Sequence, residues 1–275
     1  MIPTVCILTH CPNITYLYAT LTTIQTIRIG FPTARVLVLE NGSIPEARQH
    51  IMLAATAAEA EYLPLTGLWV PPIPHHEVLR GLLQDEPHIL APLTPSDGPL
   101  VVLDGDLLFW KSCEDWQVTG LLAGRLIPAR VVSHAQILVG EQGQLLPRLH
   151  TSFWWIPDRT ALQQRIMEIR RTHVTWDAFT PWMVPSPLDP LLWYVGDTAC
   201  NLYGAFRADC TPFTTAQLDC YDHLFMGSTP GLIAHFSSNP FPGFEWVPRV
   251  HAAAQRGDWA AIRGVWREQE AYFTG

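Results

Sequence analysis

Two short apolar runs, each followed by a helical pattern, open the chain and restrict its fold more than any other feature. Residues 4–9 and 35–39 read Thr-Val-Cys-Ile-Leu-Thr and Arg-Val-Leu-Val-Leu, as expected of strands buried on both faces. Apolar side chains recur every three or four residues over 14–27, the spacing of an amphipathic helix, and a second helix is predicted at about 45–60. A third strand is predicted over 99–104. This alternation predicts an α/β fold with a mostly parallel, doubly wound sheet flanked by helices.

The size and composition of the chain fit one large domain of this class. It has 275 residues, of which 48% are hydrophobic and only 15% charged, so it can build a sizeable core and is not disordered. Beyond residue 111, Trp, Pro and Gly interrupt the pattern, which indicates a half shaped around a second ligand. We therefore expect a single domain with halves at 1–110 and 111–275. A closing helix is predicted to start near Asp258, with Ile262 on its buried side.

Charge and cysteine usage exclude several classes of protein. The formal net charge is −8 and Lys and Arg are nowhere concentrated, so nucleic acid is not an expected partner. No apolar run reaches the roughly 18 residues of a membrane span, and the first residues read as a strand and not as a secretory signal. The six cysteines form no C-x-x-C pair. We expect a soluble, cytoplasmic protein with reduced thiols, and the sequence leaves its oligomeric state open.

Two carboxylates stand two residues apart where the third apolar run ends, at Asp104 and Asp106. Because side chains alternate along a strand, both are expected to point the same way, and Gly105 between them lets a ligand come close. Carboxylates forced together repel, and a hard divalent cation such as Mn²⁺ or Mg²⁺ neutralises them. The open positions of such a cation can take diphosphate oxygens. The alternative is an Asp-Gly-Asp turn that binds nothing.

This motif resembles that of the glycosyltransferases of the GT-A fold, a Rossmann-like α/β fold. In that fold a strand of this kind ends in an Asp-x-Asp motif that binds the metal and the diphosphate of a nucleotide sugar. The resemblance implies these roles for Asp104, Gly105 and Asp106. It also implies a nucleotide-sugar donor, most often a uridine diphosphate sugar, and leaves the sugar and the acceptor unknown.

Two further segments support the resemblance, which covers residues 4 to about 110. Residues 4–13 are similar to the first strand and nucleotide-binding loop of the GT-A fold, which implies ligand contacts from Thr9 and His10. Residues 36–43, Val-Leu-Val-Leu-Glu-Asn-Gly-Ser, resemble the second strand, which ends in a sequence of the V-V-D-N-G-S type. Glu40 replaces the usual Asp, and with Asn41 it is expected to contact the base or the ribose.

A third metal ligand is predicted from the second half. Many members of the GT-A fold place a histidine on the metal from a late strand or loop, and residues 231–235, Gly-Leu-Ile-Ala-His, fit such a place. The resemblance therefore implies His235 as a ligand, since a neutral imidazole can join two carboxylates on Mn²⁺. A histidine that only fills a structural position is the alternative.

The second half also offers candidates for acceptor binding and catalysis. His150, Trp154 and Trp155 lie in a segment of polar and aromatic residues, the composition of a pocket that stacks sugar faces, although such aromatics also fill cores. In an inverting transfer a carboxylate must take the proton of the acceptor hydroxyl. Asp197, which follows a glycine at the end of an apolar run, is our candidate for this base, or else it caps a helix. A retaining enzyme needs no such base.

Three other functions compete with this interpretation. A phosphatase of the haloacid-dehalogenase type also carries a strand that ends in Asp-x-Asp, but that motif normally opens its fold, whereas about 100 residues precede it here. A GT-A-like binding protein without turnover is a second alternative. Nucleotidyltransferases favour a glycine-rich, basic loop after the first strand, and residues 9–13 contain neither glycine nor Lys or Arg.

Overall fold

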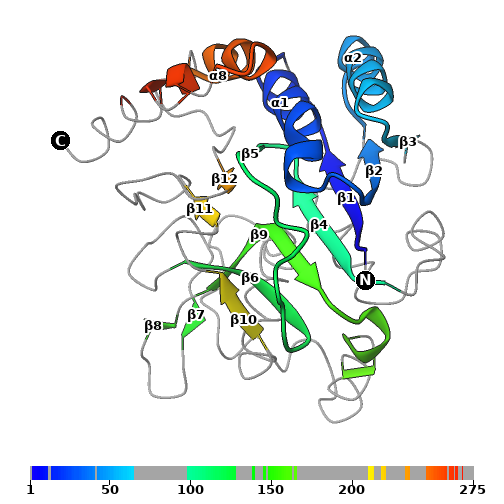
Figure 1. Cartoon of the computed structure of the whole chain (residues 1–275), viewed down its shortest axis with the longest axis vertical. Helices are drawn as coiled ribbons and strands as arrows, with labels where there is room; N and C mark the ends of the chain where they lie inside the picture. The colour runs from blue at the N-terminus through cyan, green and yellow to red at the C-terminus, as the bar shows by residue number, and fades with distance from the viewer. Residues whose placement is uncertain are drawn as a thin grey trace. The chain divides into compact units, whose positions relative to one another are not determined.

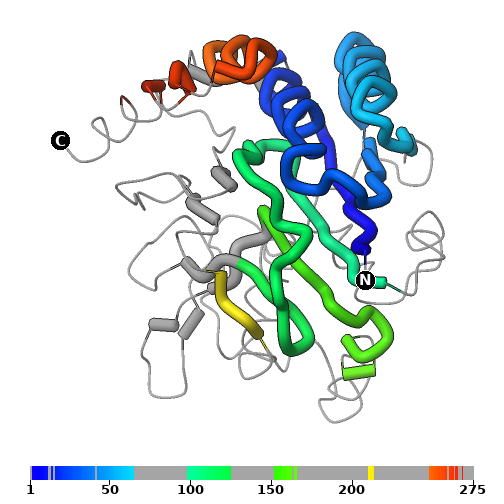
Figure 2. Tube along the Cα trace, viewed as in Figure 1, coloured from blue at the N-terminus to red at the C-terminus, as the bar shows by residue number. Residues whose placement is uncertain are grey.

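Figure 1 shows the computed structural model of the whole chain. The chain divides into two compact units. The described residues, most of which Figure 2 traces as a coloured tube, are 2–11, 14–40, 42–64, 98–127, 138–139, 145–146, 148–162, 164–165, 210–213, 218–220, 233–235, 246–258, 260–262, 264–265 and 268. The first unit comprises residue 1 with 74–101 and 117–213, and the second comprises 2–73, 102–116 and 214–275. The second unit therefore combines the N-terminal strands with the last 62 residues, which the sequence assigned to the acceptor half.

The main sheet confirms the predicted α/β class. Its strands are β1 (Thr4–Thr9), β2 (Arg35–Glu40), β3 (Glu61–Pro64), β4 (Leu100–Asp104), β6 (Leu122–Ile127), β9 (Arg148–Ile156) and β10 (Cys210–Phe213). Their order is β10-β6-β9-β4-β1-β2-β3. β1 pairs in parallel with β2, β2 with β3, and β10 with β6, whereas β6 and β9 are antiparallel. The sheet is mixed and mostly parallel, as the alternation of strands and helices predicts.

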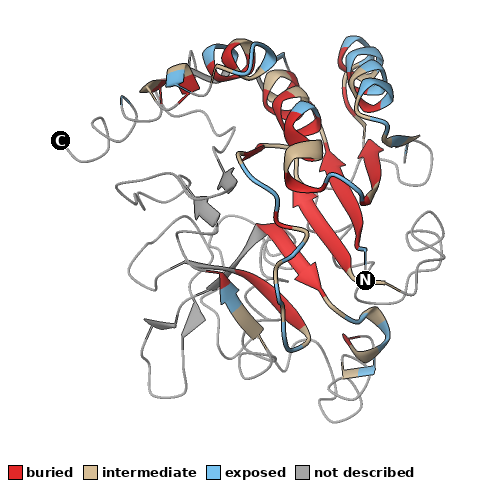
Figure 3. Ribbon diagram, viewed as in Figure 1, coloured by how far each residue is buried: buried red, intermediate tan, exposed pale blue. Residues whose placement is uncertain are grey.

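The second unit contains the predicted β-α-β-α opening. Every residue of β1 is buried, as are the last five residues of β2, so both strands form core (Figure 3). Helix α1 (Ile14–Gly30) and helix α2 (Pro45–Ala57) follow them at the expected places. The short edge strand β3 lacks the apolar run of a buried strand and was not predicted. Among the described helices none is long and apolar enough to cross a membrane.

Two small sheets complete the described strands. β5 (Leu107–Phe109) pairs antiparallel with β12 (Ile233–His235), which pairs in parallel with β11 (Leu218–Cys220). These three strands belong to the second unit. In the first unit, β7 (Leu138–Val139) and β8 (Leu145–Leu146) form an antiparallel pair.

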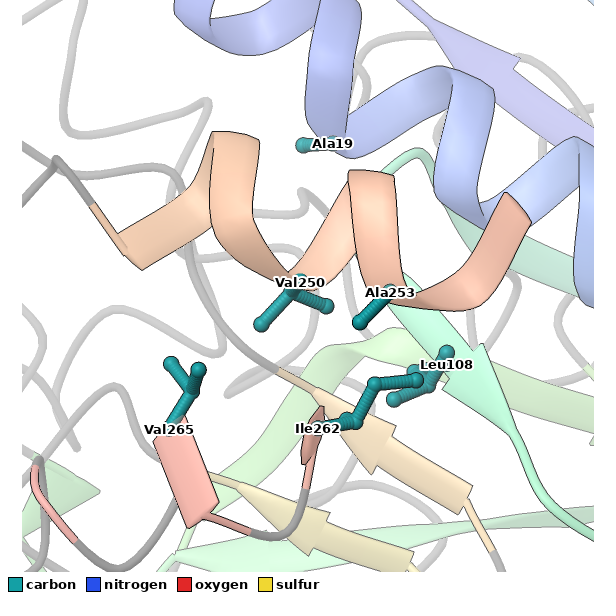
Figure 4. Packing of buried hydrophobic residues seen from close by; sticks show 6 residues of the cluster. All are labelled: Ala19, Leu108, Val250, Ala253, Ile262 and Val265. Atoms are coloured by element: carbon teal, nitrogen blue, oxygen red, sulfur yellow. The ribbon is translucent and has the colours of Figure 1, made fainter. Parts of the chain in front are cut away.

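The C-terminal helices of the second unit pack against α1. Helix α8 (Trp246–Gln255) was not predicted, because Pro248 interrupts the pattern, yet proline is tolerated in the first turn of a helix. Figure 4 shows the cluster that joins these elements, which consists of Ala19, Leu108, Val250, Ala253, Ile262 and Val265. A further helical turn begins after Asp258, whose carboxylate accepts a hydrogen bond from the Ala261 N–H at 3.0 Å. The predicted helix start near Asp258 and the burial of Ile262 are confirmed.

A buried histidine lies between α8 and α1. His251 is only 6% exposed; its Nδ1 is 3.3 Å from the hydroxyl of Thr22, and its ring centroid is 5.4 Å from that of Tyr18. Burial disfavours the charged imidazolium and lowers the pKa of His251 below its ordinary value of 6.5. The neutral ring is therefore the form that this interface accommodates.

The buried imidazole predicts a loss of stability in acid. Because the folded-state pKa of His251 is depressed, the unfolded chain binds more protons than the folded protein below about pH 6.5. The contribution of His251 to the free energy of unfolding is therefore complete above that pH and falls as the pH drops. Between pH 7.5 and pH 5.0, the free energy of unfolding measured in urea should fall more for the wild type than for His251→Gln, whose side chain at position 251 cannot titrate. Equal drops in the two proteins would contradict the assignment, since the other histidines are shared.

Candidate functional site

The carboxyl ends of β1 and β2 lie side by side in the second unit. Their parallel register pairs Thr9 with Glu40, the last residue of each strand. Thr9 is fully buried and its hydroxyl donates to the Leu39 carbonyl at 3.2 Å, whereas His10 is half-buried. In parallel α/β sheets, ligands bind beyond this edge. The register thus brings together the two loops that the sequence assigns to the nucleotide; Asn41 lies outside the described residues.

Glu40 connects these two loops from inside the protein. Its carboxylate is fully buried and accepts a hydrogen bond from the Ser43 N–H, and the Ser43 hydroxyl accepts one from the Cys11 N–H at 2.9 Å. The Nε of Arg48 lies 3.5 Å from Glu40 Oε2, and the Tyr62 hydroxyl donates to the same oxygen at 3.5 Å. Glu40 therefore orders the turn that follows β2 and, through Ser43, the loop that follows β1.

The negative charge of Glu40 affects the groups around it. Burial, together with this charge, raises the pKa of the Cys11 thiol to about 11 and that of the Tyr62 hydroxyl to about 12. Both groups are protonated at neutral pH. Cys11 accordingly contributes as a buried thiol, 3.3 Å from the hydroxyl of Thr20, and not as a nucleophile.

The two carboxylates do not lie on one continuous strand. β4 ends at Asp104, the chain bends at Gly105, and β5 begins at Leu107 in another sheet. Strand alternation therefore does not extend from Asp104 to Asp106, because the backbone bends between them, and the common direction of the two side chains stays a prediction. Asp104 and Asp106 are half-buried, and Oδ1 of Asp106 is shielded from solvent.

Gly105 is required by the close approach of β1 and α1. A Cβ atom at this position would lie 2.8 Å from the Thr20 hydroxyl oxygen and 3.3 Å from the Leu8 carbonyl oxygen. The glycine thus lets the carboxylate turn pack against the end of β1. This places the turn beside the loop that begins at Thr9.

The topology brings the predicted histidine to the same turn. In the antiparallel pair of β5 and β12, His235 is the register partner of Leu107, the residue that follows Asp106. More than 120 residues separate the two in the sequence. The pairing places the backbone of His235 next to the carboxylate turn, and its role as a ligand stays a prediction. Within the part of the chain that is described, no group of three metal-binding side chains occurs.

The acceptor-side candidates belong to the first unit. Trp154 is fully buried and Trp155 is 4% exposed, both in β9 next to the edge contact of Phe153 with Phe213. His150 lies on the same strand, and Asp197 lies outside the described residues. The burial of both rings fits core packing as well as a closed pocket, so the sugar contacts of these residues stay predictions.

Three solved glycosyltransferases share this fold. The bifunctional glycosyltransferase WbbM, in its apo form, matches with a TM-score of 0.56 and 10% identity over 95% of this chain and 51% of its own. The galactosyltransferase LgtC, solved with donor and acceptor sugar analogues, matches with a TM-score of 0.54 and 11% identity over 93% of this chain and 100% of its own. The glycosyltransferase GlyE of Streptococcus pneumoniae TIGR4 matches with a TM-score of 0.50 and 13% identity over 97% of this chain and 64% of its own.

The chain has a GT-A-like glycosyltransferase fold. This confirms the resemblance inferred from the Asp-x-Asp motif and the two strand ends. The chain spans about half the length of WbbM, under two thirds of GlyE and all of LgtC. No protein-family model and no curated relative matches the sequence. At identities of 10–13% the similarity describes the fold, and the chemistry has to be argued from the site.

The tight packing at Gly105 predicts that a single methyl group disturbs the turn. Gly105→Ala should lower the free energy of unfolding by about 1–3 kcal/mol, because the Leu8 carbonyl cannot move without shifting β1, and the Thr20 hydroxyl can move only by leaving its contact with the Cys11 thiol. Gly264 is the matched control, since no atom lies within 4 Å of a Cβ placed there and it is helical. Gly264→Ala should stabilise the protein by about 1 kcal/mol or less in urea unfolding. Equal effects of the two changes would contradict the packing at Gly105.

The Glu40 network predicts that its hydrogen bonds matter more than its charge. Glu40→Ala should lower the free energy of unfolding by about 1–3 kcal/mol, because the Ser43 N–H loses its acceptor. Glu40→Gln keeps that acceptor and removes only the ion pair with the half-exposed Arg48. Its decrease in the free energy of unfolding, measured in urea, should therefore be smaller than that of Glu40→Ala. If the two variants lose the same amount, the ion pair and not the hydrogen bond holds the loop.

Proposed function

We propose that the chain is a metal-dependent glycosyltransferase that transfers a sugar from a nucleotide diphosphate sugar, with a uridine diphosphate sugar favoured, to an acceptor. The observation that carries the proposal is the position of Asp104 and Asp106. Their turn packs against the carboxyl end of β1, beside the loops that begin at Thr9 and Glu40. Loops at this edge of a parallel α/β sheet are where such folds bind ligands.

Asp104, Asp106 and His235 are the residues that would hold a divalent cation. The donor set suits Mn²⁺ or Mg²⁺, because both prefer carboxylate oxygens and Mn²⁺ also accepts an imidazole. The Gly105 turn and the register of His235 with Leu107 bring the backbones of all three to one place in the second unit. The chemistry that such a cation would supply there is neutralisation of the charge on a departing diphosphate.

The loops after β1 and β2 are proposed to hold the nucleoside. His10 is partly accessible and Asn41 adjoins the Glu40 turn, so both remain candidates for contact with base or ribose. Thr9 and Glu40 are fully buried and engaged with neighbouring backbone. We therefore propose that Thr9 and Glu40 hold the two loops in place, so that the nucleoside binds to a preformed surface.

The transfer itself exchanges one bond at the anomeric carbon. The acceptor hydroxyl oxygen attacks that carbon, the bond to the diphosphate oxygen breaks, and the hydroxyl proton leaves to a base. We propose Asp197 as this base if the configuration is inverted, with His150, Trp154 and Trp155 on the acceptor side. A retaining transfer does not require this role of Asp197.

The competing functions have less support. A haloacid-dehalogenase-like phosphatase carries its paired aspartates after the first strand of the fold, whereas here they lie at the end of β4, the fourth of the described strands. A GT-A-like binding protein without turnover is distinguished from the enzyme only by measurement.

Calorimetric titration with UDP and GDP, each with Mn²⁺ and again with excess chelator, tests the proposal. Metal-dependent binding of either nucleotide is the expected outcome. Asp106→Asn should weaken that binding at least about tenfold while urea unfolding stays nearly unchanged, because even outer-shell partners of metal sites contribute about 10–100-fold to affinity.

The matched control for charge is Asp115→Asn, which removes an exposed carboxylate of the same unit and should bind as the wild type does. Absence of metal-dependent binding to either nucleotide by the wild type would reject the proposed function. Equal loss of binding in the Asp106 and Asp115 variants would reject the site assignment alone.

A further inference from the structure

A threonine of α1 holds the backbone of β5 at the residue that follows Asp106. The Thr23 hydroxyl accepts a hydrogen bond from the Leu107 N–H at 2.8 Å and donates one to the Leu107 carbonyl at 2.9 Å. A hydroxyl has one proton and two lone pairs, so it can satisfy both backbone groups of one residue. A neighbouring antiparallel strand would supply the same pair of bonds. Thr23 is fully buried, so bulk water has no access to its hydroxyl.

The same face of α1 supports β5 further along. Thr26 lies one helical turn after Thr23, and its hydroxyl accepts a hydrogen bond from the Phe109 N–H at 3.3 Å. Backbone groups of successive strand residues point to opposite edges, so the first and third residues of β5 face α1. Leu108 between them faces β12, where its register partner is Ala234. β5 therefore has threonine hydroxyls on one edge and a strand on the other.

We propose that Thr23 is a positioning residue for the Asp106 carboxylate and for the strand that carries His235, an inference that rests on the function proposed above. Leu107 is covalently attached to Asp106 and is the register partner of His235. Without the hydroxyl, both backbone groups of Leu107 are buried with no acceptor or donor from α1, and a shift of β5 relieves that cost. Such a shift carries the carboxylate turn and β12 with it.

Three variants separate this role from a general contribution to stability. Thr23→Val removes the hydroxyl at nearly constant volume, and Thr23→Ser keeps it. Thr22→Val is the matched control, because Thr22 is equally buried in the same helix but its hydroxyl bonds to the Tyr18 carbonyl at 2.9 Å and approaches His251 of α8. Each variant is titrated with UDP at fixed Mn²⁺, and with Mn²⁺ at fixed UDP, and its unfolding in urea is measured.

Thr23→Val should weaken Mn²⁺-dependent UDP binding about tenfold or more, in the range of outer-shell partners of metal sites. Thr23→Ser should bind within about threefold of the wild type, as the retained hydroxyl predicts. Thr22→Val should lose stability and keep wild-type binding. Wild-type affinity in Thr23→Val, or the same loss of affinity in Thr22→Val, overturns the proposal.

Amide exchange measured by NMR gives an independent readout. In the wild type the Leu107 amide should be protected, and in Thr23→Val it should exchange faster while amides of β1 stay protected. If the wild type binds no nucleotide, the proposed function fails and the positioning role fails with it, while unchanged protection in Thr23→Val shows that the hydroxyl does not hold the strand. If Thr23→Val does not fold, Thr26→Val serves instead, with a smaller expected loss of UDP affinity because Phe109 is further from Asp106.

Discussion

The hydrogen-bonding demand of a strand placed against a helix determines how the carboxylate turn is held. β5 has β12 on one edge, and its other edge faces α1, whose backbone is already used within the helix. The buried threonines of α1 supply the hydrogen-bond partners that this edge of β5 needs, because their hydroxyls reach the strand backbone. A threonine methyl group can pack there as a methyl group of valine would. Thr23 and Thr26 occupy positions where an ordinary amphipathic helix would carry leucine. Polar side chains on a buried helix face are therefore an essential part of this fold.

The same unit contains a second polar network, centred on Glu40. A buried carboxylate costs free energy unless its oxygens are satisfied, and here the Ser43 N–H, Tyr62 and Arg48 surround it. The network ties the turn after β2 to the loop after β1 through Cys11. The described residues of the two loops are consequently ordered by buried hydrogen bonds. This arrangement gives the acidic residue at position 40 a structural role, whether or not it also contacts a nucleotide.

The chain shares its fold with glycosyltransferases of known structure at only 10–13% identity. A fold persists as long as its pattern of buried strands and helix faces is kept, and many side-chain combinations satisfy that pattern. A site is more specific, since it depends on a few groups at fixed positions. For this chain the groups that we propose are the carboxylates of Asp104 and Asp106, the turn at Gly105 and the strand that ends at His235.

The sequence by itself determined the class of the fold, the first two strands and helices, the strand that ends at Asp104, and the acidic motif, because each depends on local periodicity and on residues near in sequence. Only the tertiary structure decided that β4 and β5 belong to different sheets, that Glu40 is a buried support of its loop, and that β12 brings residue 235 beside Leu107. Such pairings depend on contacts between residues far apart in the chain. A hydroxyl at position 23 carries no periodic signal that marks it as the partner of a strand more than 80 residues away, because that partnership arises only when helix and strand pack together.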